Sequence, residues 1–136
     1  MARYIASHSS EGSEVRPAGC WEAQLRKGFL EMAILASLWT NRQYGLEIIR
    51  TLDSKPGLAL AEGTLYLILN RLKHDALVAS EWVEAGTGHP RKYYWLTKAG
   101  KERLRAMARF WAEFSGDLNA LLSPVMDRKE ELSARK

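Results

Sequence analysis

A basic stretch without acidic residues is the first feature of this 136-residue sequence that could do chemistry. Residues 86–99 contain no Asp or Glu, and their potential cations are His89, Arg91, Lys92 and Lys98. Clustered cations of this kind are suited to binding the phosphates of a nucleic acid. An ordinary solvated loop remains the alternative on charge alone, because the formal net charge of the whole chain is only +4.

Polar side chains that could contact DNA bases or phosphates lie further upstream, between Glu62 and Asn70. Thr64 can donate to a phosphate or touch a thymine methyl group, and Asn70 can pair with adenine. Gly63 would allow a close approach of two backbones, and Tyr66 offers a hydroxyl on a rigid ring. In the purely structural alternative, Tyr66 packs against the preceding helix and Thr64 only supports the start of its own helix.

The titratable residues form no catalytic or metal-binding pattern. The three His are scattered along the chain, and Cys20 is the only cysteine, which excludes an intrachain disulfide. We find no pairing of a nucleophile with a base, no metal-ligand spacing and no phosphate-binding loop. We therefore expect neither an enzyme nor a cofactor or metal site.

Three helices are predicted to position these residues. Apolar residues at three- and four-residue spacing predict helices over Trp21–Thr40, about Gln43–Asp53 and about Glu62–Asp75. Tyr44, at the start of the second helix, is a further candidate for a phosphate contact. The expected core face of that helix consists of Leu46, Ile49 and Leu52.

The period then changes to that of a β-hairpin. Val78–Ala85 and Arg91–Leu96 are short, β-branched and aromatic segments, and a Gly-rich loop joins them. Strand alternation places Arg91 and Lys92 on opposite faces. We expect Trp82 and Trp95 to pack this hairpin onto the helices.

A long helix follows, with Thr97 as its N-cap and Pro124 as its end. Its apolar residues are spaced 3, 4, 3, 4, 3, which is an a/d seam. The first helix can cover part of this seam, and a two-fold dimer would cover the rest. The expected dimer residues are Leu104, Met107, Trp111, Phe114, Leu118 and Leu121, together with Leu25 and Phe29 of the first helix.

The whole pattern is that of a mainly α winged helix-turn-helix with a two-stranded wing and a long C-terminal dimerisation helix. In this layout the third helix enters the DNA major groove. The expected organisation is a disordered tail over 1–19, the DNA-binding domain over 20–97, the dimerisation helix over 98–123 and a charged tail over 124–136. No signal peptide or membrane-spanning stretch is recognisable, so a cytoplasmic location is expected.

Over about residues 22–122 the sequence resembles the PadR family of bacterial transcriptional regulators. The motifs that carry the resemblance are Tyr44-Gly45-Leu46-Glu47-Ile48-Ile49, Gly63-Thr64-Leu65-Tyr66 with Leu69 and Arg71-Leu72, and Gly88-His89-Pro90-Arg91-Lys92-Tyr93-Tyr94 followed by Leu96-Thr97 and Gly100. Three positions depart from the family pattern. Ala61 stands where a capping Ser is common, Leu67 where Pro often follows the Tyr, and Ala76 where Gly often closes the helix.

The single C-terminal helix resembles that of the short subfamily, which dimerises through it. Within that group the chain is similar to the lactococcal multidrug-resistance regulator, in which a Trp of the last helix lines a drug-binding channel, and Trp111 falls at that spacing. The resemblance implies a homodimer on a palindromic operator in double-stranded DNA, most simply a repressor released by a small planar aromatic or apolar effector at Met107, Trp111 and Phe114. Trp111 as an ordinary dimer-core residue remains open, and so does a winged helix that binds a protein and not DNA.

Overall fold

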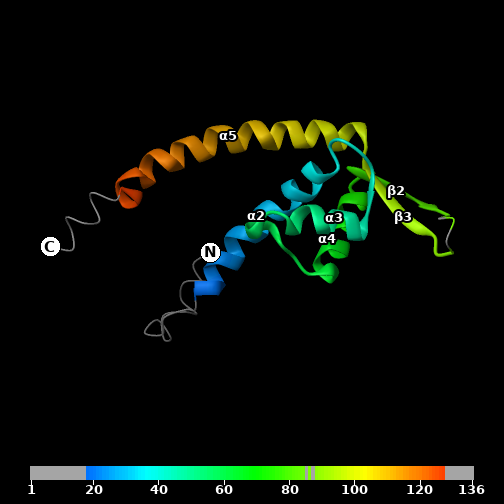
Figure 1. Ribbon diagram of the computed structural model, residues 1–136. Coiled ribbons are helices and arrows are strands. Elements are labelled where there is room, and N and C mark those ends of the chain that lie inside the picture. Colours follow the sequence, from blue (N-terminus) through cyan, green and yellow to red (C-terminus); the bar gives the residue numbers. More distant parts are fainter. Residues whose placement is uncertain (1–17, 85, 87, 128–136) are drawn as a thin grey trace, which may run out of the picture.

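The computed structural model describes residues 18–84, 86 and 88–127. Its elements are α2 (Ala18–Ser37), β1 (Gln43–Tyr44), α3 (Gly45–Asp53), the short 3-10 helix η2 (Pro56–Leu58), α4 (Glu62–His74), β2 (Val78–Val83), β3 (Arg91–Leu96) and α5 (Lys98–Met126). Figure 1 shows α2, α3 and α4 grouped into one body, with the β2–β3 hairpin projecting from one end and α5 extending well beyond the body at the other. This is the predicted winged helix-turn-helix architecture, and we call the β2–β3 hairpin the wing.

One apolar core joins the four α-helices to the base of the wing. Its buried residues come from α2, α3, α4, the base of the wing and the start of α5; they are Ile34, Leu35, Leu38, Ile48, Leu52, Leu65, Leu69, Leu72, Leu77, Val78, Tyr94, Leu96 and Leu104. Burying a side chain of this size contributes roughly 1.5–3 kcal/mol, so the core fixes α4 relative to the wing.

The predicted core face of α3 is wrong at one position. Ile48 and Leu52 are buried, whereas the side chain of Leu46 is 46% exposed. Ile48 and Leu46 are two residues apart and therefore point about 200° apart around the helix. Spacing alone could not distinguish the two faces, because Leu46, Ile49 and Leu52 also repeat at three-residue intervals.

The sheet has a third strand that the sequence analysis missed. Its strand order is β1-β3-β2, all antiparallel, with Tyr44 opposite Tyr93 in the first pair and Trp82 opposite Lys92 in the second. β1 is only two residues long, so it carries no alternation that could be recognised. The predicted strand over Val78–Ala85 also ends earlier, at Val83.

Trp82 corrects another expectation. It was expected to pack the wing onto the helices, but it lies toward the wing tip and its side chain is 67% exposed. Trp95 is half-buried, and the guanidinium of Arg42 lies 4.2 Å from the centre of its ring. Cross-strand register explains the difference, because the inner face of the wing is buried only at its base, around Val78, Tyr94 and Leu96.

The helix ends differ from the predicted ones. α2 runs from Ala18 to Ser37 and so begins inside the predicted tail 1–19, of which residues 1–17 lie outside the described residues. α5 continues through Pro124 to Met126, so the predicted end at 123 is wrong. A proline removes one hydrogen bond to the carbonyl four residues earlier, which costs little in the exposed last turn of a helix. Residues 128–136 of the predicted charged tail lie outside the described residues.

The predicted helix caps are confirmed. The hydroxyl of Thr97 accepts a hydrogen bond from the Gly100 amide at 3.0 Å and donates one to the Ala76 carbonyl at 2.7 Å. Ala61 is the N-cap of α4 and makes no side-chain capping bond. Ala76 has a φ of +63°, so the turn after α4 takes the left-handed conformation without a glycine.

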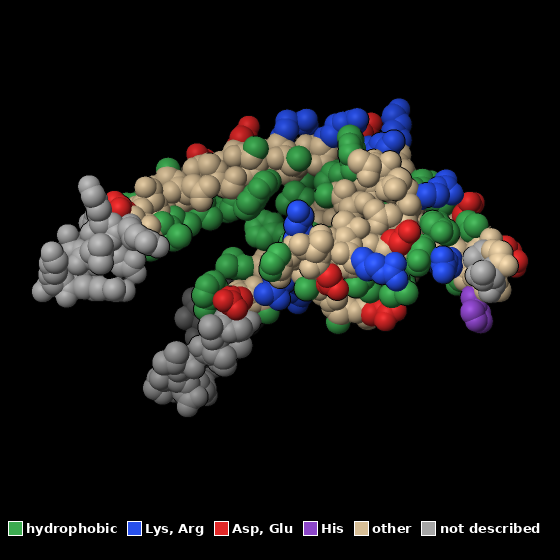
Figure 2. Space-filling model, viewed as in Figure 1, with side chains coloured by type: hydrophobic (Ala, Val, Ile, Leu, Met, Phe, Trp, Pro, Cys, Tyr) green, Lys and Arg blue, Asp and Glu red, His purple; other side chains and the backbone are tan. Residues whose placement is uncertain are grey.

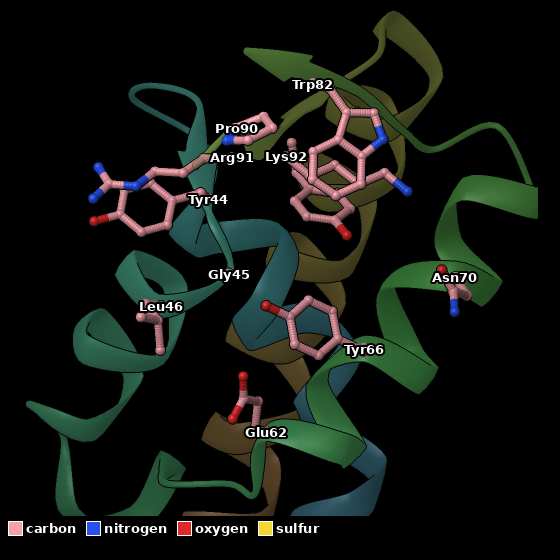
Figure 3. Close-up of a pocket in the computed structure, with 11 residues that line it drawn as sticks. Tyr44, Gly45, Leu46, Glu62, Tyr66, Asn70, Trp82, Pro90, Arg91 and Lys92 are labelled. Carbon is pink, nitrogen blue, oxygen red and sulfur yellow. The ribbon is translucent and has the colours of Figure 1, made fainter. Parts of the chain in front are cut away.

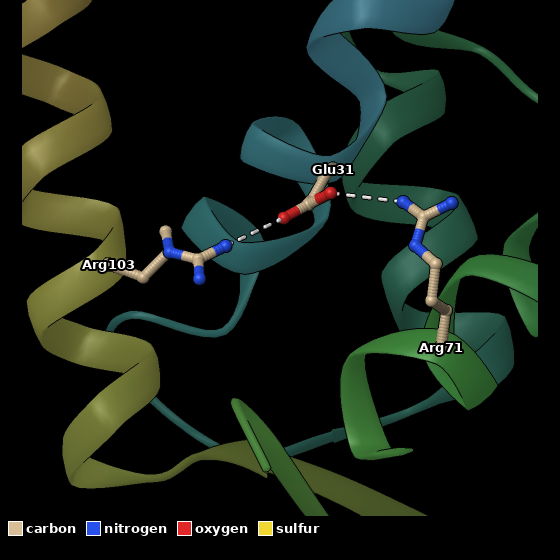
Figure 4. A network of polar contacts seen from close by, with 3 residues as sticks. All are labelled: Glu31, Arg71 and Arg103. Carbon is tan, nitrogen blue, oxygen red and sulfur yellow. Dashed lines mark hydrogen bonds and ion pairs between the residues drawn. The ribbon is translucent and has the colours of Figure 1, made fainter. Parts of the chain in front are cut away.

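One carboxylate links three helices (Figure 4). Glu31 of α2 accepts from Arg71 of α4 at 3.0 Å and pairs with Arg103 of α5 at 3.5 Å. The Glu31 side chain is the least exposed of the three, and the two arginines approach it from opposite sides. Within the described part of the chain, no helix is long and apolar enough to span a membrane.

Candidate nucleic-acid interface

A concave surface of about 570 Å³ lies between the starts of α3 and α4 on one side and the wing on the other (Figure 3). We call it the α4–wing groove; its lining residues are Tyr44, Gly45, Leu46, Glu62, Tyr66, Asn70, Trp82, Pro90, Arg91, Lys92 and Tyr94. Six of the predicted DNA contacts are among them, namely Tyr44, Glu62, Tyr66, Asn70, Arg91 and Lys92. The groove therefore brings together candidates that are far apart in the sequence.

Three predicted contacts lie beside the groove and do not line it. Gly63 and Thr64 are exposed on the first turn of α4, and His89 is exposed in the loop before β3. A Cβ atom added at Gly63 would have no neighbour within 4 Å, so the backbone is open to an approaching molecule there. The first turn of α4 and the wing loop thus flank the groove with accessible polar groups.

Arg91 is held over an aromatic ring on the outer side of the wing. Its guanidinium carbon lies 4.5 Å from the centre of the Tyr44 ring, which itself meets the Tyr93 ring edge to face at 5.4 Å. A cation–π contact of this exposed kind contributes about 0.5–1 kcal/mol. The Tyr44 amide is in turn held by the Glu47 carboxylate at 3.1 Å, so Glu47 fixes the start of α3. The arrangement presents a cation with a defined direction at the edge of the groove.

Lys92 lies on the opposite face of β3, as strand alternation predicts. Its ammonium is 5.7 Å from the centre of the Trp82 ring and 5.9 Å from that of Tyr94. In Figure 3 its chain passes beside the Trp82 ring and extends toward the side of α4 that carries Asn70. Burial lowers the pKa of Lys92, and the neighbouring Lys73 lowers it further by charge repulsion and a side-chain contact.

Tyr66 is half-buried, and its ring packs against the start of α3. A Cβ on Gly45 would overlap the Tyr66 hydroxyl, so the glycine is required for this close approach. Burial, and then the nearby Glu62 carboxylate, raise the pKa of the Tyr66 phenol. Burial also raises the pKa of Tyr94, and Tyr66 adds to this shift. The structure thus shows the packing role that the sequence offered as the alternative for Tyr66, in a residue that also lines the groove.

Sequence reasoning missed several residues of the groove. Trp82, Leu46 and Pro90 line it, and the charge of Lys73 on α4 contributes to the lowered pKa of Lys92. The sequence pattern places Leu46 on the core face of its helix by spacing, and it places Trp82 between the wing and the helices. The register of β2 against β3 places Trp82 beside Lys92, and it depends on where the hairpin loop begins. The sequence did not define the beginning of that loop.

The apolar seam of α5 is divided between two environments. Leu104 is buried in the core of the protomer and Met107 packs against that core, so Leu104 is wrong as a dimer contact. Trp111 is 41% exposed and meets Phe29 of α2 edge to face at 5.1 Å. The first residues of the seam are buried within the protomer because the first turns of α5 lie against α2. From Trp111 onward the residues of the seam are exposed.

Beyond Trp111 the apolar side chains have few neighbours in this chain. Phe114 stacks on Phe110 of the preceding turn at 5.5 Å, and Leu118 and Leu121 are exposed, the latter by 76%. Leu25 of α2 is exposed as well. Figure 2 shows apolar side chains along the side of α5 that faces α2. We call the exposed set Trp111, Phe114, Leu118 and Leu121 the α5 stripe.

Comparison with known proteins places this fold among transcriptional regulators. A family model described as "Transcriptional regulator PadR-like family" matches residues 34–106, which is more than half of the chain. A PadR-like transcription factor from Bacteroides fragilis is 41% identical, with a TM-score of 0.63 over 73% of this chain and 95% of its own. A PadR-like regulator from Bacillus cereus is 31% identical, with a TM-score of 0.67 over 73% of this chain and 96% of its own.

A third related structure contains nucleic acid. Bacillus subtilis PadR, solved in complex with operator DNA, is 25% identical with a TM-score of 0.54, over 58% of this chain and 46% of its own. The matched family consists of transcriptional regulators and not of enzymes, as the sequence predicted. The chain belongs to the PadR-like family of transcriptional regulators.

Proposed function

We propose that this chain is a dimeric, sequence-specific DNA-binding regulator that holds the duplex in and around the α4–wing groove. The observation that carries the proposal is the convergence of Arg91 and Lys92 of the wing on a groove whose other wall is α4. The complex of the related Bacillus subtilis PadR with operator DNA supports the same partner for this chain.

The residues around the groove divide into two kinds of contact. Thr64 and the open backbone at Gly63 stand on the first turn of α4, which enters the major groove in a helix-turn-helix and touches base edges there. Arg91, Lys92 and His89 belong to the wing, and they bind phosphates or the adjacent minor groove. Tyr44 and Asn70 lie between these two groups and contact the backbone.

The α5 stripe supports the dimer. It places several large apolar side chains on a helix that extends past its own domain, and a second copy related by a two-fold axis would bury them. Two-fold symmetry would also present two copies of α4 to successive major grooves, which matches a palindromic operator.

The effector is proposed from Trp111. Its half-exposed indole, with Phe29 against one edge and Phe114 beside it, offers an aromatic wall at the edge of the stripe, and Met107 adds an adaptable neighbour. A small planar aromatic or apolar compound bound there would prefer one spacing of the two α4 helices. Binding of the compound would release a repressor from DNA only through this difference in affinity between the two states.

Electrophoretic mobility shift with the DNA upstream of the chain's own gene tests the proposal. We expect salt-sensitive, sequence-specific binding that is lost in the double variant Arg91→Ala, Lys92→Ala. The matched control is Lys101→Ala, Arg105→Ala on α5, which removes the same two charges away from the groove and should retain binding. Wild-type protein that shows no specific binding would overturn the proposal, and unchanged binding by the wing variant would favour a protein-binding winged helix.

Tryptophan fluorescence tests the effector. Titration with planar aromatic compounds should quench the emission of the wild-type protein and weaken its binding to the operator. Trp111→Ala should remove most of the quenching. Quenching that persists in full in that variant would place any bound compound elsewhere.

A further inference from the structure

Two lysines from different elements belong to the end of the α4–wing groove where Asn70 lies. Lys73 is exposed on the last turn of α4, and Lys92 reaches toward α4 from β3 beside the Trp82 ring (Figure 3). Lys73 follows Asn70, which lines the groove, by three residues and so lies on the same side of α4. Its charge adds to burial in lowering the pKa of Lys92. Such proximity of two cations is unfavourable unless something of opposite charge lies between them.

The described part of the chain does not supply that opposite charge. None of its ion pairs includes Lys73 or Lys92. Glu62 is the only acid that lines the groove, and it lies eleven residues before Lys73 on α4, roughly 16 Å along the helix axis. Glu81 belongs to the other face of the wing, where it binds Arg42 at 3.0 Å. Among the described residues, neither lysine therefore has an acidic partner in an ion pair, and both can accept an anion from outside the chain.

We propose that Lys73 and Lys92 together bind a single phosphate of the DNA backbone, at the place where one strand passes between α4 and the wing. This inference rests on the proposed function and adds Lys73 to its contacts. The Trp82 ring restricts the directions open to the Lys92 ammonium, which reduces the entropy lost on binding. Asn70 stands one turn before Lys73 on α4 and lines the groove, so its amide can donate to the same phosphate.

The helix dipole offers a simpler reason for a lysine at position 73. Cations are favourable in the last turn of a helix, and Arg71 and His74 are there as well. That effect does not explain why the Lys92 chain extends toward a like charge. If Lys73 acted only through the helix dipole, replacing it would lower the stability of the fold and leave the DNA affinity unchanged. Measuring both quantities therefore separates the two explanations.

The test uses fluorescence anisotropy with the full-length protein and two labelled duplexes, its operator and an unrelated sequence, over a range of salt concentrations. Lys73→Gln and Lys92→Gln should each weaken binding to both duplexes by a similar factor, roughly tenfold, because a phosphate contact carries no sequence information. The double variant should be little weaker than the single ones. The negative slope of log K against log salt should become shallower by about 0.9 in the double variant, which is the value for one phosphate.

Lys101→Gln on α5 is the matched control and should leave affinity and slope unchanged, and thermal unfolding should show that all variants remain folded. Unchanged affinity and slope in Lys73→Gln, with weakened binding in Lys92→Gln, would overturn the shared site. A slope that becomes shallower by about 1.8 in the double variant would also overturn the shared site, because each lysine would then bind its own phosphate. Wild-type protein that binds neither duplex would instead overturn the proposed function itself.

Discussion

At the scale of single residues, Ala76 adopts an unfavourable backbone conformation in the turn between α4 and the wing. Its φ of +63° lies in the left-handed region, where a Cβ is unfavourable by about 1–2 kcal/mol. Hydrogen bonds hold it there: its amide donates to the Lys73 carbonyl at 3.0 Å, and its carbonyl accepts from the Thr97 hydroxyl at 2.7 Å. The turn therefore joins the end of α4 to the start of α5.

Ala76→Gly should stabilise the protein by about 1 kcal/mol, because glycine adopts this conformation without the steric cost. Urea unfolding at a fixed protein concentration would measure the change, and the m-value should not alter. The control is Ala106→Gly on the exposed side of α5, which should destabilise by roughly 0.5–1 kcal/mol. A decrease in stability for Ala76→Gly would show that its strain is relieved in solution.

Sequence reasoning succeeded with residues whose role is local. The cap at Thr97 follows from residue type and position, and the missing cap at Ala61 and the unfavourable turn at Ala76 follow from comparing single positions with the family pattern. It failed with Trp82 and Leu46, whose surroundings depend on strand register and on which side of α3 meets the core. Lys73 belongs to the same class, because its neighbour Lys92 is distant in the sequence.

At the scale of elements, α4 has one face that packs in the core and another that is exposed to solvent. Leu65, Leu69 and Leu72 are buried in the core, while Gly63 and Thr64 face outward on the first turn. The boundaries of α4 and β3 were predicted nearly to the residue, because α4 has a clear helical period and β3 is an aromatic segment that follows a Gly-rich loop. β1 and the end of α5 were not, since pairing across the sheet and tolerance of Pro124 are settled by the surroundings.

Gly63→Ala should separate these surfaces. The new methyl group meets nothing within 4 Å in the free protein, so stability should be unchanged or slightly higher. Operator affinity should fall about tenfold if the DNA backbone approaches this turn closely. Calorimetry and anisotropy would measure the two effects. Gly57→Ala, which also adds a methyl group in open space, should change neither, and full operator affinity in Gly63→Ala would remove this turn from the interface.

At the scale of the whole molecule, the two halves of α5 have different surroundings. The first half packs against the domain, and the second half leaves its apolar side chains exposed. Its first turns are fixed to the core by Leu104 and to the base of the wing by Gly100, where a Cβ would overlap the Leu77 carbonyl oxygen. Its second half carries the α5 stripe. The seam was visible in the sequence, but the point where it leaves the protomer depends on how far α2 runs beside it.

Leu118→Glu, Leu121→Glu should convert a wild-type dimer into a monomer at micromolar concentration. Each leucine buried in a two-fold interface contributes roughly 1.5–3 kcal/mol per copy, and the added carboxylates would face each other. Size-exclusion chromatography with light scattering would give the mass. Leu67→Glu, on an exposed leucine of α4 outside the stripe, is the control and should leave the mass unchanged. A wild-type protein of monomer mass would contradict the proposed dimer.

The contacts of Glu31 have a mechanical consequence. One negative charge is shared between Arg71 and Arg103, so tilting α5 away from α2 would leave the whole carboxylate to Arg71 and tighten the hold of α2 on α4. Phe29, two residues earlier on α2, touches Trp111 of α5. α2 therefore contacts α5 through Phe29 and Glu31 and α4 through Glu31, so any movement of α5 at Trp111 would meet α2 before it could reach α4.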